Sequence, residues 1–214
     1  MDLTAYRRPL LFGGSFDPPQ VAHVVQPRYV MEKLAADVVL YIPAAQSPHK
    51  LDRPPTPPHH RLAMLHLSLD DQPHARILTD ELERAAAYPG APSYTIDTVA
   101  ALLPRLGLGA QPRLLIGADQ LRAFHRWKDW LRLVELAEPV VMVRPPDTRE
   151  NLLNDLPAPL AGDRHAWARR LIDTPVIDVS ATDVRARAAA DRLFDHLVRP
   201  AVAEYIAAHG LYRG

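Results

Sequence analysis

The stretch "GGSFDPPQVAH" near the start of the chain joins residue types that could bind and polarise a phosphate group. Gly13 and Gly14 follow an apolar run, and because they lack a Cβ they allow a ligand to approach the backbone. His23 falls near the start of the expected next helix, where free N–H groups favour an anion to which the imidazole could donate. The alternative is a tight strand-to-helix turn in which Ser15 or Asp17 caps the helix, and the stretch alone favours neither interpretation.

Three more polar segments, "QSPHK" (46–50), "GADQ" (117–120) and "VSATDVR" (179–185), each follow an apolar run of strand length. The expected strands are 9–13, 37–44, 75–80, 113–119, 140–144 and 175–179. The expected helices are 22–34, 58–69, 93–106 (opening at Ser93), 182–190 and 200–210.

This alternation predicts an α/β fold: a Rossmann-like, mainly parallel sheet with helices on both faces, in a single domain over 1–214. Ligands bind such sheets at the carboxyl ends of the strands. We therefore expect the four polar segments to converge on one crevice.

Several other functions are excluded by their missing motifs. The sequence has no G-x-x-x-x-G-K-[ST] phosphate loop, no G-x-G-x-x-G after a strand and no G-x-S-x-G around Ser15. It has no cysteine, and His59, His60, His66 and His74 lack the paired spacing of a zinc site, so no metal-ligating residues are predicted.

Composition narrows the choice of partners. The formal net charge is zero, which predicts neither a nucleic-acid partner nor an anionic membrane surface. No apolar run has the length of a signal peptide or a membrane span, so we expect a cytoplasmic protein. The sequence leaves the oligomeric state open, a homo-oligomer being one alternative.

"GGSFDPPQVAH" resembles the [TS]-F-D-P-x-H-x-G-H signature of the nucleotidylyltransferase superfamily. "IPAAQSPHK", "PSYTIDT", "LIGADQLRAFHRWKDW", "VSATDVR" and "VAEYIAAHGLY" resemble, in order, successive motifs of bacterial nicotinate mononucleotide adenylyltransferases. The resemblance covers nearly the whole chain.

It implies transfer of AMP from ATP, with Mg²⁺, to nicotinate mononucleotide, giving deamido-NAD and pyrophosphate in NAD biosynthesis. The attacking phosphate oxygen is already ionised, so the reaction needs no protein nucleophile or general base. The protein has to position two anions and stabilise the charge of the transition state.

For the mononucleotide, the resemblance implies phosphate contacts from His49 and Lys50 and a carboxylate site at Thr95 and nearby backbone N–H groups. Asp119, just past a strand, could accept from ribose hydroxyls. Trp127 occupies the family's stacking position against the pyridine ring, although a tryptophan is more often part of a core.

For ATP, the resemblance implies a site that spans both ends of the chain, completed by a C-terminal helical part at about 180–214. Ser180 and Thr182 would cap a helix and offer hydroxyls, while Arg185 would brace the β- and γ-phosphates. The expected catalytic residues are His23, Lys50 and Arg185. The expected ATP-binding residues are Gly13, Gly14, Ser15, Phe16, Gln20, His23, Ser180, Thr182 and Arg185.

The chain departs from the family signature at two positions. Gln20 stands where the family has the first histidine, and Ala22 stands where it has glycine. A lost charge-assisted donor is worth about 1.5–3 kcal/mol, or a rate loss on the order of 10- to 100-fold. These departures predict a weakened but active enzyme, with a nucleotide-binding homologue that has lost catalysis as the alternative. Two further alternatives do not depend on them: an enzyme that uses nicotinamide mononucleotide, and another adenylyltransferase, such as the phosphopantetheine enzyme.

Overall fold

A computed structural model describes residues 1–45, 55–90 and 92–213. In this part of the chain, six strands form one fully parallel sheet in the order β3-β2-β1-β4-β5-β6. The strands are β1 (Pro9–Gly14), β2 (Val38–Pro43), β3 (Ala75–Ile77), β4 (Arg113–Gly117), β5 (Glu138–Val143) and β6 (Leu171–Asp173). The predicted Rossmann-like sheet is confirmed.

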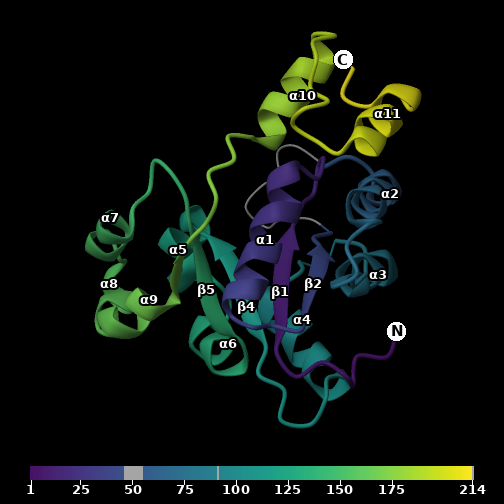
Figure 1. Ribbon diagram of the computed structural model, residues 1–214. Coiled ribbons are helices and arrows are strands. Elements are labelled where there is room, and N and C mark those ends of the chain that lie inside the picture. Colours follow the sequence, from purple (N-terminus) through teal and green to yellow (C-terminus); the bar gives the residue numbers. More distant parts are fainter. Residues whose placement is uncertain (46–54, 91, 214) are drawn as a thin grey trace.

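Helices connect these strands and also follow the last of them, and Figure 1 shows helices on both sides of the sheet. They are α1 (Val21–Lys33), α2 (Pro58–Leu69), α3 (Asp80–Ala87), α4 (Thr95–Leu102), α5 (Ala118–Ala123), α6 (Trp130–Leu136), α7 (Arg149–Asn154), α8 (Ala158–Ala161), α9 (Arg164–Arg170), α10 (Ala181–Ala189) and α11 (Pro200–Ala208). Two short 3-10 helices follow α4 and α5, at Leu103–Arg105 and Phe124–Arg126.

The central strand β1 is apolar throughout because both of its faces are buried. Leu11 joins a core with side chains of α4, α6 and α9, whereas Leu10 and Phe12 join the opposite core with α1 and α2. A third core joins Met64 of α2 to α10 and α11. Figure 1 shows α10 and α11 at the top, beyond the end at which β1 finishes.

The strand order reverses between β1 and β4, which pair over Leu10–Phe12 and Arg113–Leu115. In open α/β sheets, ligands bind outside the carboxyl ends of the strands at this reversal. The loops that follow β1 and β4 are therefore the first places to look for a binding site.

The predicted sixth strand at 175–179 was wrong. The strand is Leu171–Asp173, which pairs with Val141–Val143 of β5. The Thr174 N–H still donates to the Val143 carbonyl at 3.0 Å, but Pro175 has no N–H and the pairing stops.

Other predicted boundaries were also wrong. The strand expected at 113–119 ends at Gly117, because Ala118 begins α5. The strand expected at 75–80 ends at Ile77, because Asp80 already begins α3, a helix that the apolar pattern did not predict. The helix expected from Ser93 begins at Thr95 instead, with Tyr94 at its N-cap, and it is continued by a 3-10 turn.

Candidate functional site

Two hydrogen bonds join His23 and Gln20 at the start of α1. The His23 N–H donates to the Gln20 carbonyl at 2.9 Å, and the Gln20 N–H donates to His23 Nδ1 at 3.1 Å. Because Nδ1 accepts this bond, the neutral imidazole carries its proton on Nε2. The turn therefore presents His23 as a donor through Nε2, at a helix terminus that already favours anions.

The surroundings of His23 keep its imidazole neutral. Its ring packs against Phe16 and Phe12, with centroid distances of 5.3 and 5.9 Å. Burial, together with the positive charge of Arg144, lowers the pKa of His23 from 6.5 to about 4. At neutral pH the side chain is thus an uncharged hydrogen-bond donor.

The two glycines at the end of β1 serve different purposes. A Cβ on Gly13 would meet only the Ile42 carbonyl at 4.0 Å, so the backbone there is open to approach. A Cβ on Gly14 would lie 3.0 Å from the Phe16 ring. The side chain of Phe16 is buried, and its backbone has a φ of 47°. Because the side chain is buried, a contact of Phe16 with ATP would have to come from its backbone. Ser15, between Gly14 and Phe16, is exposed.

Arg61 of α2 ties the strand-end loops together from inside the protein. It is fully buried, and its guanidinium donates to the carbonyls of Ser15 (2.7 Å), Ala44 (2.8 Å) and Thr56 (2.9 Å). These carbonyls belong to the loops after β1 and β2. A buried arginine thereby fixes the backbone on which His23 and its neighbours depend.

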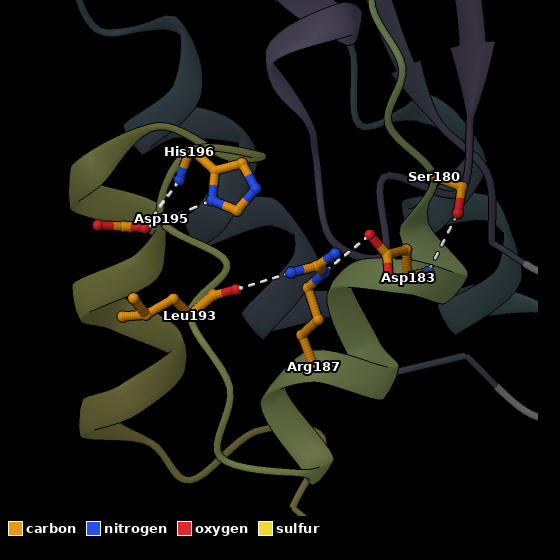
Figure 2. Close-up of polar contacts among 6 residues, drawn as sticks. All are labelled: Ser180, Asp183, Arg187, Leu193, Asp195 and His196. Atoms are coloured by element: carbon orange, nitrogen blue, oxygen red, sulfur yellow. Dashed lines mark hydrogen bonds and ion pairs between the residues drawn. The ribbon is translucent and has the colours of Figure 1, made fainter.

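Helix α10 approaches the same loop through Arg185. Ser180 caps this helix as predicted, accepting from the Asp183 N–H at 3.1 Å (Figure 2). Arg185 donates to the Asp17 carbonyl at 2.7 Å and to the Thr182 hydroxyl at 3.2 Å. The structure therefore brings the two ends of the predicted ATP site together.

The candidate site has a second part, which we call the second wall: helix α4, whose first residue is Thr95, and the segment Trp127–Lys128. Thr98 donates to the buried Glu81 carboxylate at 3.0 Å and accepts from Arg84 at 2.7 Å. Burial raises the pKa of Glu81, against the opposing effect of its hydrogen bond with Thr98. Arg84 also donates to Ser93 at 3.2 Å, so α3 fixes the segment that leads into α4.

The structure also brings Trp127 to α4, through the next residue, Lys128. Lys128 Nζ forms an ion pair with Asp97 at 3.1 Å and lies 4.7 Å from the centroid of the Tyr94 ring. Trp127 is partly exposed and packs against Phe124, with ring centroids 5.2 Å apart. The partly exposed Trp127 ring thus directly precedes a residue that contacts α4 and its N-cap residue, Tyr94.

Asp119 lies in the first turn of α5, directly after β4, and it is exposed. A Cβ on Gly117 would come within 2.7 Å of its carboxylate, so a larger residue there would displace the end of this exposed side chain. Asp119 and His23 therefore follow β4 and β1, the two strands at the reversal of strand order. The predicted phosphate residues His49 and Lys50 lie outside the described residues.

Sequence reasoning missed Arg144, Arg61 and the role of Asp17. Arg144 directly follows β5, and the rule that used polar residues after strands could have identified it. The apolar pattern gives no sign that Arg61 is buried, because a charged residue on a helix is expected at the surface. Within the described residues, no group of three or more His, Asp or Glu side chains could hold a metal ion. No helix there is long and apolar enough to cross a membrane.

Comparison with known proteins shows the family to which this chain belongs. Residues 11–187 match the family described as "Cytidylyltransferase-like". A protein of Thermomicrobium roseum named "Probable nicotinate-nucleotide adenylyltransferase" is 39% identical over 203 residues, which are 95% of this chain and 90% of that protein. A protein of Chromobacterium violaceum with the same name is 37% identical over 211 residues, covering 95% and 97%.

A solved structure supports the fold. The nicotinic acid mononucleotide adenylyltransferase of Plasmodium falciparum, in complex with NaAD, superimposes with a TM-score of 0.67 at 18% identity. The match covers 97% of this chain and 98% of that one. The chain belongs to the cytidylyltransferase-like family and, within it, to the nicotinate-nucleotide adenylyltransferases.

Proposed function

We propose that the protein transfers the AMP group of ATP to nicotinate mononucleotide, giving nicotinate adenine dinucleotide and pyrophosphate. The names of its relatives support the reaction. The observation that carries the assignment of the site is the bond from the Gln20 N–H to His23 Nδ1, which leaves a neutral histidine with its proton on Nε2.

The reaction forms a bond between a phosphate oxygen of the mononucleotide and the α-phosphorus of ATP. The bond from that phosphorus to the bridging oxygen breaks, and the electron pair leaves with pyrophosphate. His23 would donate from Nε2 to a phosphate oxygen without giving up its proton. This donation stabilises the charge that develops in the transition state.

The C-terminal helical part, about 180–214, would complete the ATP site. Arg185 is already held against the loop after β1 and would brace the β- and γ-phosphates. Lys50 would supply a positive charge to the phosphate of the mononucleotide. We propose that Mg²⁺ enters with ATP, whose phosphate oxygens are the hard ligands that this ion prefers.

The mononucleotide would bind against the second wall. The pyridine ring would stack on Trp127, the ribose hydroxyls would donate to Asp119, and the carboxylate would meet Thr95 and the N–H groups at the start of α4. A carboxylate gains from the positive end of a helix dipole, whereas a neutral amide gains less. This difference supports the acid as the preferred substrate.

A pyrophosphate-release assay with ATP and Mg²⁺ tests the proposal. We expect turnover with nicotinate mononucleotide, less with nicotinamide mononucleotide, and none above background for His23→Ala, whose folding is checked by circular dichroism. A clear preference for the amide would contradict the substrate assignment. If ATP binds but neither mononucleotide reacts, the chain is a nucleotide-binding homologue without this activity.

A further inference from the structure

The segment after α11 turns back toward the loop between β1 and α1. Gly210, at a φ of 58°, ends the helix, and the Leu211 N–H donates to the Ile206 carbonyl at 3.0 Å. This turn brings Tyr212 against the core shared by α2, α10 and α11. The Tyr212 hydroxyl then donates to Asp17 Oδ1 at 2.7 Å. Residues 195 positions apart are thereby joined.

Asp17 is the point at which three segments meet. It is buried, and its second carboxylate oxygen accepts from the Thr56 N–H at 3.1 Å. Its carbonyl accepts from Arg185 at 2.7 Å. The Asp17 carboxylate therefore orients the residue whose carbonyl accepts from Arg185. The proposed reaction needs the guanidinium of Arg185.

Both sides of this contact have unusual backbone conformations. Phe16, directly before Asp17, has a φ of 47°, and Tyr212 has a φ of 66°. Left-handed backbone is disfavoured for aromatic residues and persists where the surrounding structure over-determines it. The hydrogen bond between Tyr212 and Asp17 lies directly between these two strained positions.

The other arginine near the end of α10 is held elsewhere. Arg187 forms an ion pair with Asp183 at 2.9 Å and donates to the Leu193 carbonyl at 3.3 Å (Figure 2). Arg185 is thus the arginine of this helix that contacts Asp17, and its position depends on how Asp17 is held.

We propose that Tyr212 is a positioning residue of the ATP site. Its hydroxyl fixes the Asp17 side chain and, through the Asp17 carbonyl, sets the position of Arg185. The proposal rests on the proposed function, in which Arg185 braces the phosphates of ATP. Tyr212 itself contacts neither substrate.

The test is Tyr212→Phe, which removes one hydroxyl and keeps the ring that packs on the core. We expect the KM for ATP to rise about 5- to 10-fold, because the lost hydrogen bond is charge-assisted and only part of its loss reaches Arg185. The KM for the mononucleotide should stay within about 2-fold, since the second wall does not involve Tyr212.

Tyr205→Phe is the matched control. Tyr205 lies on α11, and its hydroxyl bonds to His60 at 2.9 Å rather than to Asp17. It should leave both KM values within about 2-fold. If both variants lower the melting temperature equally and the KM for ATP is unchanged in each, Tyr212 only anchors the chain end and the proposal is overturned.

Asp17→Ala, which removes the acceptor of the Tyr212 hydroxyl, gives a second test that does not depend on Tyr212 alone. If Tyr212 acts through Asp17, the double variant should have the same KM for ATP as Asp17→Ala. Effects that multiply would contradict the proposal. If the unmodified protein makes no dinucleotide, the proposed function fails instead, and calorimetry with Mg²⁺–ATP then tests the positioning role. That role requires weaker binding by Tyr212→Phe than by Tyr205→Phe.

Discussion

Replacing Arg61 by methionine tests whether one buried cation holds the loops of the site. Arg61 makes three hydrogen bonds of 2.7–2.9 Å to the carbonyls of Ser15, Ala44 and Thr56. Methionine fills much of the same volume and donates to none of them. The variant therefore leaves these carbonyls, and that of Ala45, in need of new partners, and it removes the positive charge near the Asp17 carboxylate.

The expected loss of stability follows from these contacts. An unsatisfied buried polar group costs about 1–3 kcal/mol, and a hydrogen bond to a charged group contributes about 1.5–3 kcal/mol. The cost of burying the guanidinium disappears in the variant and offsets part of the loss. We expect a net loss of about 3–5 kcal/mol in the free energy of unfolding, a large share of the total for a domain of this size.

Urea denaturation of Arg61→Met measures this loss, with Arg113→Met as its control. Arg113 is also an arginine near the sheet, but it is partly exposed and lies 3.4 Å from Glu138, so its replacement should cost less than about 1 kcal/mol. The folded fraction of Arg61→Met should also turn over more slowly, because the backbone before His23 is released. A loss below about 1 kcal/mol with normal turnover would refute the role given to Arg61.

Three further predictions concern the site itself. Gln20→His should raise kcat/KM about 10- to 100-fold, because the backbone of residue 20 already caps α1 and the new side chain can carry charge; unchanged kinetics would contradict this. The native His23 imidazole, with its pKa of about 4, binds its proton more weakly than the unfolded chain does. Acidification from pH 6.5 to about 4 should therefore lower the free energy of unfolding by about 1–2 kcal/mol, after allowance for the partial exposure of the His23 side chain. Denaturation curves of His23→Gln should lack this effect. Trp127→Ala should raise the KM for the mononucleotide about 10-fold and leave that for ATP nearly unchanged, and equal effects on both would argue against stacking.

The predictions from sequence were most successful where one physical rule dominated. Continuous apolar runs identified β1, β2, β4 and β5, because strands buried on both faces admit few polar residues. The last strand was misplaced because Leu171–Asp173 is only three residues long and Pro175 begins a run of similar composition. Periodicity likewise gave no sign of the short helices from α5 to α9.

The site could be predicted in part for a similar reason. Residues after strands, such as His23 and Asp119, follow from topology. The residues that hold them do not. Asp17 and Tyr212 are far apart in sequence and meet only in the folded chain. The tautomer of His23 depends on a backbone N–H, which is present at every residue except proline and therefore leaves no trace in the sequence.

The most direct measurement is identification of the product. Purified protein with ATP, Mg²⁺ and nicotinate mononucleotide should give nicotinate adenine dinucleotide and pyrophosphate in equal amounts, detected by chromatography and mass spectrometry. His23→Ala should give neither. Absence of the dinucleotide with the unmodified protein would contradict the proposed function, and its undiminished formation by His23→Ala would contradict the role of His23.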